Sequence, residues 1–220
     1  MIKVGVVSLG CAKNRVDTEL MLGILQNGGY EITANPALAE VLIVNTCGFI
    51  DSAKQESIDT LLELNEYRQN GRLKVLAATG CLIQRYEKEL LTELPEVDLM
   101  LGVNQYERLP QALAEALNGK RAAYCGDDYH ILSGERVLTT PPYTAYVRIA
   151  DGCDNRCAYC AIPLIRGPFR SRPMADILAE IQTLAKRGVK EFVLVAQDTS
   201  RFGVDTQKRS LLPDLLEKAA

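Results

Sequence analysis

Three cysteines form the most informative pattern in the chain, a Cys-x-x-x-Cys-x-x-Cys run written CDNRCAYC. They are Cys153, Cys157 and Cys160. Three thiolates at this spacing, with no fourth close by, can bind three irons of a four-iron cluster and leave the last iron open to an exchangeable ligand. An electron-carrier cluster normally has four protein ligands, so the incomplete set predicts a reaction site.

Zinc is the main alternative for this triplet. A structural zinc site needs four closed ligands, usually from two Cys-x-x-Cys or Cys/His pairs. The chain has one histidine, His130, and no second pair near the triplet. The spacing therefore favours an iron–sulfur cluster over zinc.

The triplet follows a predicted strand, the apolar run from Tyr143 to Ala150, which stops at Asp151 and Gly152. We therefore expect the three cysteines to lie in a loop. With the aromatic Tyr159 before its last cysteine, the triplet resembles that of the radical S-adenosylmethionine (SAM) enzymes. The resemblance implies that the open iron binds the amino and carboxylate groups of SAM and that reductive cleavage gives a 5′-deoxyadenosyl radical. It also implies that the backbone around Tyr159 meets the adenine.

The first half of the chain alternates predicted strands and helices. The strand-like runs are Lys3–Leu9, Val41–Asn45, Lys74–Ala78 and Asp98–Leu101. The helical patterns are Asp17–Asn27, Ser52–Arg68, Gln84–Leu94 and Tyr106–Asn118, with Asp51 as a predicted N-cap and Gly28-Gly29 as a predicted stop. The strand runs are continuously apolar, as is typical of strands covered on both faces. This pattern predicts an α/β fold with a doubly wound parallel sheet.

A cysteine follows each of the first three predicted strands. These are Cys11, Cys47 and Cys81, and glycine precedes the first and the last of them. In a doubly wound sheet the carboxyl ends of the strands share one edge, where ligands bind. A lone cysteine there would be a small buried residue. Three in equivalent positions predict a metal site, with a second open-iron 4Fe-4S cluster as its natural occupant and helix N-termini to stabilise its negative charge.

Two asparagines in these loops are not assigned a ligand role. Asn14 and Asn45 could orient the cluster loops, but asparagine after a strand more commonly forms a turn, so the turn is the expectation.

Both cysteine sets together resemble those of the radical SAM methylthiotransferases, enzymes that insert sulfur into a C–H bond and methylate it. The resemblance covers nearly the whole chain. It implies a flavodoxin-like amino-terminal domain that binds an auxiliary cluster through Cys11, Cys47 and Cys81. It also implies two 4Fe-4S clusters, with SAM as the further cofactor. The radical would take a hydrogen from the substrate carbon, which then collects a methylated sulfur carried on the auxiliary cluster.

Two phrases resemble the ribosomal-protein (RimO-type) branch of this family, SLGCAKNRVDTE near the start and VAQDTSRFGVD at residues 195–205. That branch acts on the β-carbon of an aspartate in a small-subunit ribosomal protein, so the implied partners are this protein and an electron donor such as flavodoxin. Two alternatives stay open. One is the branch that modifies an adenosine of tRNA, and the other is a non-catalytic iron–sulfur carrier.

The predicted domains are residues 1–118 for the auxiliary cluster, a linker at 119–142, and 143–220 as the first units of a radical SAM (β/α) barrel. The linker contains Cys125, which is expected to be a spare thiol. The residues after 142 are too few to close a barrel, so we expect the chain to be inactive alone and its open sheet edge to be covered by association or domain swapping.

Three arginines follow the triplet, Arg166, Arg170 and Arg172. They could hold a carboxylate of SAM or of an acidic substrate, because guanidinium forks match carboxylates. A solvated basic loop explains them equally well.

Composition excludes several classes of protein. The 220 residues are 47% hydrophobic with a formal net charge of −3, so the chain lacks the overall basic charge typical of DNA-binding and other nucleic-acid-binding proteins, and only local basic patches stay open. Seven cysteines, an odd number at these spacings, do not predict a disulfide framework and suit a reducing cytoplasm. No apolar run approaches the length of a membrane span. We therefore expect a cytoplasmic enzyme.

Overall fold

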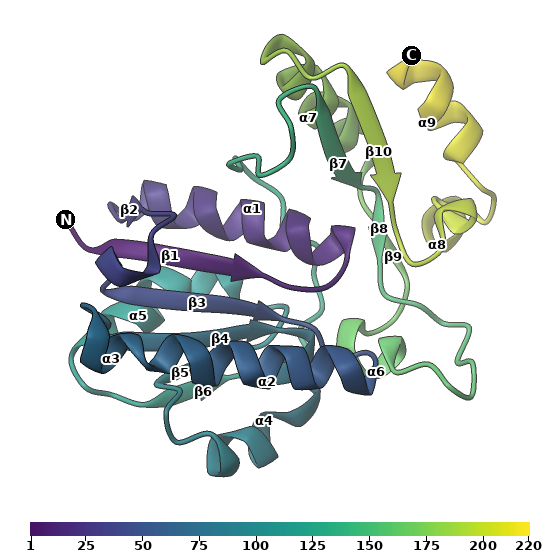
Figure 1. Cartoon of the computed structure of the whole chain (residues 1–220). Coiled ribbons are helices and arrows are strands. Elements are labelled where there is room, and N and C mark those ends of the chain that lie inside the picture. The colour runs from purple at the N-terminus through teal and green to yellow at the C-terminus, as the bar shows by residue number, and fades with distance from the viewer. The chain divides into compact units, whose positions relative to one another are not determined.

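The structure is a computed structural model that describes residues 1–220. The chain forms two compact units, shown in Figure 1. The first comprises Met1–Asp128 together with Leu132–Val137, and the second comprises Tyr129–Ile131 together with Leu138–Ala220.

A six-stranded sheet forms the centre of the first unit. Its strands are β1 (Lys3–Ser8), β2 (Glu31–Ile32), β3 (Val41–Thr46), β4 (Val75–Gly80), β5 (Leu99–Leu101) and β6 (Ala122–Tyr124). All neighbouring strands are parallel, in the order β2-β1-β3-β4-β5-β6. This extends the flavodoxin-like order, whose switch point lies between β1 and β3. The predicted α/β fold class is confirmed.

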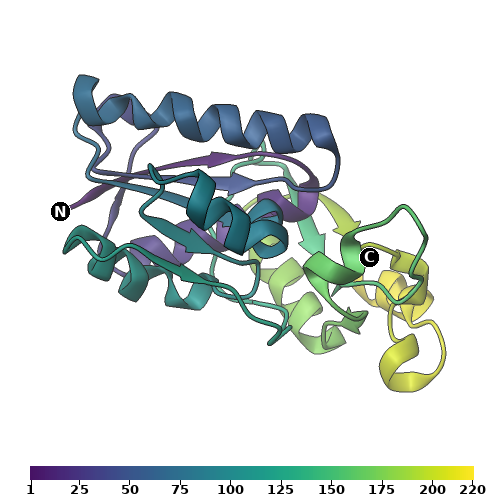
Figure 2. The same ribbon diagram turned by 90° about the horizontal axis from the view of Figure 1, so that it is seen from below.

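Helices cover both faces of this sheet, as Figure 2 shows from below. They are α1 (Ala12–Asn27), α2 (Asp51–Asn65), α3 (Tyr67–Asn70), α4 (Cys81–Glu93) and α5 (Leu109–Leu117), with the 3-10 turns η1 (Pro36–Leu38) and η2 (Tyr106–Arg108). Helices α1 and α5 pack on one face, and α2 and α4 pack on the other. The predicted stop of α1 is confirmed, because Gly28 caps it and Gly29 has a positive φ of 81°.

The two central strands are buried at every residue, which explains why their sequences are continuously apolar. Their side chains alternate between the two helical layers. One layer forms a cluster with α2 and α4 that includes Leu42, Val44, Leu61, Leu76, Leu82, Ile83 and Met100. Each Å² of apolar surface buried stabilises the fold by ~25 cal/mol. The burial of β3 and β4 between two helical layers is therefore the main stabilisation that keeps the strand ends in register.

Short or polar elements differ from the sequence-based expectation. Strands β2 and β6 were not predicted. β2 has only two residues, whereas β6 is as long as β5 but only half-buried at all three residues, and it lies inside the segment 119–142 expected to be a linker. The predicted N-cap Asp51 is wrong. Ile50 is the N-cap, while Asp51 is the first helical residue and forms an ion pair with Lys54.

Residues 132–137 pack along α1. A side chain at Gly23 would collide with the carbonyl of Glu135, so glycine permits this close approach. Val137 N donates to Glu19 O at 3.1 Å, and Arg136 Nη1 lies 2.8 Å from Glu19 Oε2. Both charged side chains are almost fully buried, so the ion pair is shielded from water.

The second unit is built around a β-α-β unit. Its main strands are β7 (Thr144–Arg148) and β10 (Glu191–Val195), which pair in parallel, while β8 (Ala150–Asp151) and β9 (Arg170–Ser171) form a small antiparallel pair. Its helices are α6 (Ile162–Arg166), α7 (Met174–Lys186), α8 (Val204–Gln207) and α9 (Leu212–Ala219), with the 3-10 turn η3 (Thr199–Arg201). The single predicted strand at 143–150 divides into β7 and β8.

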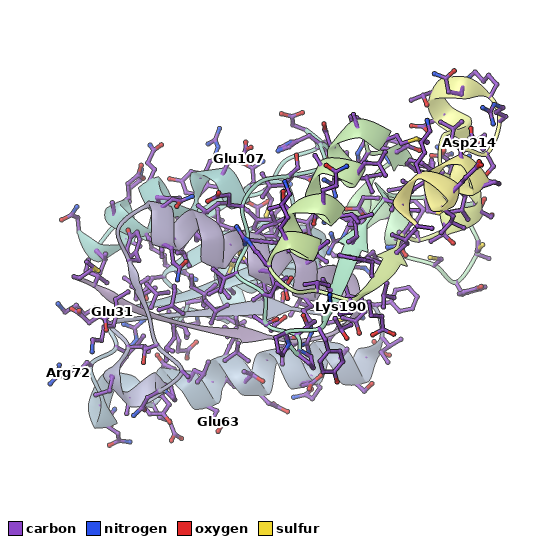
Figure 3. The ribbon with its side chains drawn as sticks, turned by 90° about the horizontal axis from the view of Figure 1, so that it is seen from above. Glu31, Glu63, Arg72, Glu107, Lys190 and Asp214 are labelled. Atoms are coloured by element: carbon purple, nitrogen blue, oxygen red, sulfur yellow. The ribbon has the colours of Figure 1, made fainter.

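The core of the second unit lies between β7, β10 and the helices α7 and α9. Ala145 and Val147 pack against Ile177, Ile181 and Leu215. Charged side chains project from the surfaces of both units, among them Glu31, Glu63, Arg72, Lys190 and Asp214 in Figure 3. None of the helices combines the length and the apolar composition needed to cross a bilayer.

The buried ion pair of the first unit gives a stability prediction. Arg136→Ala removes the guanidinium that pairs with the buried Glu19 carboxylate, and removing one partner of a buried pair costs about 3–5 kcal/mol. We expect this loss in urea-induced unfolding. Lys74→Ala is the matched control, because it breaks the exposed pair with Glu40 and should change the unfolding midpoint little. Equal unfolding midpoints for the two variants would contradict the claim that the buried Glu19–Arg136 pair stabilises the first unit.

Candidate metal centres

Three cysteines lie at the carboxyl edge of the six-stranded sheet, as predicted. Cys11 follows β1 and is the N-cap of α1, Cys47 follows β3, and Cys81 is the first residue of α4 directly after β4. Strands β1 and β3 flank the switch point of the sheet, where ligands bind in open α/β folds. We call Cys11, Cys47 and Cys81 the edge cysteines.

The three thiols converge. Asn14 Oδ1 lies 4.0 Å from Cys11 Sγ and 3.6 Å from Cys81 Sγ, so one amide oxygen contacts both sulfurs. Cys47 packs against the loop of Cys11, because a Cβ atom placed on Gly10 would lie 3.2 Å from Cys47 Sγ. The sheet therefore brings together residues that are far apart in sequence.

Hydrogen bonds hold the Cys47 loop in place. Cys47 N donates to Ser57 Oγ at 3.0 Å, and Ser57 Oγ donates to Ala53 O at 2.8 Å. Arg85 Nη1 donates to Gly48 O at 3.2 Å. Side chains from α2 and α4 thus anchor the backbone on which Cys47 is carried.

Both glycines that precede an edge cysteine have positive φ, 85° at Gly10 and 96° at Gly80. Side chains would also be crowded there, because a Cβ atom on Gly80 would lie 2.7 Å from Thr46 O. The two glycines therefore let neighbouring strand-end loops pack closely against one another.

Two of the edge cysteines stand at helix N-termini. No group of three or more His, Cys, Asp or Glu side chains is arranged to hold one metal ion. The N-termini of α1 and α4 begin at Cys11 and Cys81, so their dipoles favour an anionic group there.

The cysteine triplet occupies the loop between β8 and β9, as the sequence predicted. Cys153 N donates to Gly167 O at 3.0 Å, and Asp154 Oδ1 accepts from Phe169 N at 3.0 Å. These bonds join the first part of the loop to the chain just before β9. Farther along, Cys157 is exposed and Tyr159 is 87% exposed, so this part of the loop is open to a ligand.

A buried carboxylate supports the base of this loop. Asp151 Oδ2 lies 3.2 Å from Arg166 Nη1 and 3.7 Å from Arg148 Nη1. Burial raises the pKa of Asp151, but the guanidinium groups of Arg166 and Arg148 outweigh it and hold the pKa below its ordinary value. Asp151 therefore stays ionised and balances the buried arginines.

Of the two alternatives left open for these arginines, the solvated basic loop is wrong for Arg166 and Arg172, and binding of a carboxylate of SAM or of a substrate stays a prediction. Arg166 and Arg172 are buried and hold carboxylates of the chain itself, Arg166 that of Asp151 and Arg172 that of Glu180 at 2.6 Å. Arg170 donates to backbone carbonyls and stacks over the ring of Tyr129. Internal packing, which the local sequence does not reveal, gives these arginines their partners.

The remaining cysteine, Cys125, lies after β6. Its Sγ contacts Ile83 O at 3.7 Å, and burial raises its pKa to about 12. A thiol that stays protonated is a poor metal ligand. All seven cysteines are free of disulfides.

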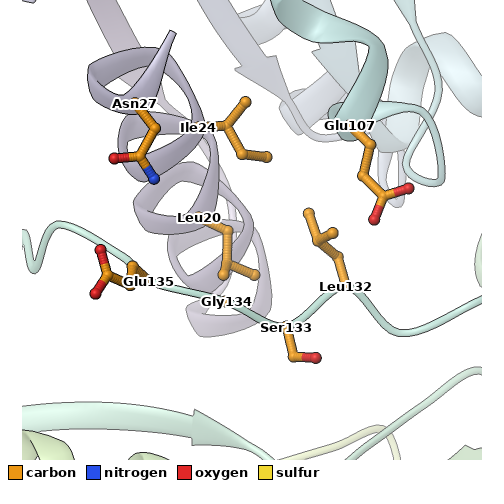
Figure 4. Close-up of a pocket in the computed structure, with 8 residues that line it drawn as sticks. All are labelled: Leu20, Ile24, Asn27, Glu107, Leu132, Ser133, Gly134 and Glu135. Carbon is orange, nitrogen blue, oxygen red and sulfur yellow. The ribbon is translucent and has the colours of Figure 1, made fainter.

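A pocket of about 410 Å³ lies elsewhere on the first unit (Figure 4). It is lined by Leu20, Ile24, Asn27, Glu107 and residues 132–135. Leu20 is nine residues from Cys11 along α1, or ~13 Å at 1.5 Å per residue. The pocket is therefore separate from the edge cysteines.

Comparison with known proteins agrees with this two-part organisation. A family model described as "Uncharacterized protein family UPF0004" matches residues 3–102, which contain the edge cysteines. A second, described as "Radical SAM superfamily", matches residues 147–214, which contain the triplet. That superfamily implies SAM and a 4Fe-4S cluster.

Curated relatives extend over nearly the whole chain. Proteins named "Ribosomal protein uS12 methylthiotransferase RimO" from Pelotomaculum thermopropionicum and Desulforamulus reducens are each 52% identical to it, over 98% and 99% of the chain. The protein of that name from Clostridium kluyveri is 51% identical over 98%. The chain spans about half the length of these relatives, 49% to 50%.

Crowding and a backbone conformation that essentially only glycine adopts (φ 96°, ψ −156°) together make Gly80 hard to replace. Gly29 has a similar positive φ, but nothing lies within 4 Å of an added Cβ. Gly29→Ala should therefore cost about 1 kcal/mol of unfolding free energy, whereas Gly80→Ala adds overpacking and should cost about 3 kcal/mol or more. Urea unfolding measures both. Similar losses would show that the backbone at Gly80 is not closely packed.

Proposed function

Because the chain belongs to the RimO-type branch of the radical SAM methylthiotransferases, we propose that it binds two 4Fe-4S clusters, each through three cysteines. The ligands of the auxiliary cluster are Cys11, Cys47 and Cys81. Those of the SAM-binding cluster are Cys153, Cys157 and Cys160.

The convergence of the edge cysteines is the single observation that carries this proposal. A radical SAM domain alone needs only the triplet. Here three further cysteines follow neighbouring strands of a separate sheet, and one amide oxygen touches the sulfurs of two of them. Three ligands per cluster leave one iron without a protein ligand, and this is the arrangement expected of a reaction site.

The triplet loop provides the SAM site in this proposal. A bound cluster there would supply the electron that cleaves SAM to a 5′-deoxyadenosyl radical. The chain supports this site in two ways. The Asp151–Arg166 pair fixes the base of the loop, and the exposed position of Tyr159 leaves its backbone accessible to the adenine.

The proposed reaction places a methylthio group on the β-carbon of an aspartate in a small-subunit ribosomal protein. The name carried by the relatives, all about half identical to this chain, supports uS12 as the substrate. An electron donor such as flavodoxin completes the proposed set of partners, and the cytoplasm is the proposed location.

The outer edges of β7 and β10 could pair with a strand of another chain. These two strands pair only with one another, so each has a free edge, and Val193 on β10 is 37% exposed. We include association of the chain through this edge, by strand addition or domain swapping, in the proposal.

The substrate is tested by mass spectrometry of uS12 and of tRNA from cells with and without the gene. We expect deletion to remove a methylthio group from uS12 and to leave tRNA unchanged. Loss from an adenosine of tRNA would instead support the other branch of the family. Unchanged modification of both molecules would leave a non-catalytic iron–sulfur carrier as the better account.

Cysteine variants of the anaerobically reconstituted enzyme test the two ligand sets. Cys11→Ala should abolish sulfur insertion yet retain cleavage of SAM to 5′-deoxyadenosine, because the triplet is intact. Cys153→Ala should abolish both activities. Cys125→Ala is the matched control and should retain both. SAM cleavage by the Cys153→Ala protein would contradict the assignment.

A further inference from the structure

Asn14 contacts three loops at once. It lies in the first turn of α1, and its side chain is buried, with 1% of the residue exposed. Its Nδ2 donates to Leu9 O at 3.1 Å and to Thr46 O at 3.0 Å, which are backbone atoms beside Cys11 and Cys47. Its Oδ1 contacts the sulfurs of Cys11 and Cys81. One amide therefore reaches every strand end that carries an edge cysteine.

The orientation of this amide follows from its hydrogen bonds. Nδ2 carries two hydrogens, and two carbonyl oxygens accept from it. A flipped amide would place Oδ1 against those carbonyls, where acceptor would face acceptor. The amide oxygen is thus directed toward the thiols. The backbone of Asn14 is held as well, because Asn45 Nδ2 donates to Asn14 O at 2.8 Å.

We propose that Asn14 is a positioning residue that sets the spacing of Cys11 and Cys81 before a cluster binds. The purpose of this spacing rests on the proposed function. A site whose ligands are already in place loses less conformational freedom on binding, so affinity rises. Asn14 takes no direct part in the chemistry and acts only by positioning the two cysteines.

Thr18 provides a matched control on the same helix. It lies one turn after Asn14 and is 2% exposed. Its hydroxyl donates to Ser8 Oγ and accepts from Asn45 Nδ2, both at 2.9 Å, and makes no contact with a thiol. Thr18→Val therefore removes two buried hydrogen bonds from the same region, as loss of the Asn14 amide does, without touching a cysteine.

The test uses the metal-free, fully reduced chain and dibromobimane, which becomes fluorescent when both of its arms have alkylated thiols. Peptide mapping identifies the Cys11–Cys81 product. We expect Asn14→Ala to lower the rate of this product at least tenfold and Thr18→Val to leave it within twofold of the parent. Asn14→Asp fills the same volume but cannot donate to the two carbonyls, so it should behave like Asn14→Ala.

Two outcomes would overturn the proposal. One is an unchanged Cys11–Cys81 product in Asn14→Ala. The other is an equal loss in Thr18→Val, which would show that general packing and not this amide holds the thiols. Circular dichroism of each variant identifies global unfolding, and in that case the isosteric Asn14→Asp protein decides the result.

Iron content separates this proposal from the proposed function. After anaerobic reconstitution the parent should hold about eight irons per chain, two clusters of four, and Asn14→Ala should hold about half as many. The two proposals separate if the parent protein binds no iron at the edge cysteines while the yield of the cross-linked Cys11–Cys81 product still depends on Asn14. In that case the proposed function fails and the positioning role stands.

Discussion

Parallel strands end at one edge of a sheet only when every crossover returns the chain to the opposite edge, and this constraint governs the first unit. It places Cys11, Cys47 and Cys81 on neighbouring loops although long helices separate them in sequence. Burial of the hydrophobic core stabilises this arrangement, because β3 and β4 are buried along their whole length between two helical layers. A slip in strand register would separate the thiols.

Close backbone packing refines what the topology provides. Gly10 and Gly80 adopt positive φ, so the strand-end loops approach one another without side chains between them. The side chains of Asn14 and Ser57 then fix the backbone near the cysteines. The second unit uses a different device for its triplet, a loop that is closed by the short β8–β9 pair and supported by the buried carboxylate of Asp151.

Much of this arrangement was predictable from periodicity and spacing. The continuously apolar runs located β1, β3, β4 and β5, and the strand-to-helix period located the edge cysteines. What the sequence did not reveal depends on contacts between distant residues. Strand β6 is only half-buried and pairs with β5 at the edge of the sheet, and Asn14 looks like an ordinary turn former until its amide is seen against Cys81.

The central claim is that the edge cysteines hold a cluster of their own. The most direct measurement is Mössbauer spectroscopy of the ⁵⁷Fe-reconstituted chain in which Cys153, Cys157 and Cys160 are all replaced by Ala. The account predicts the spectrum of one 4Fe-4S cluster, with about four irons per chain. A folded protein that takes up no cluster under these conditions would contradict it.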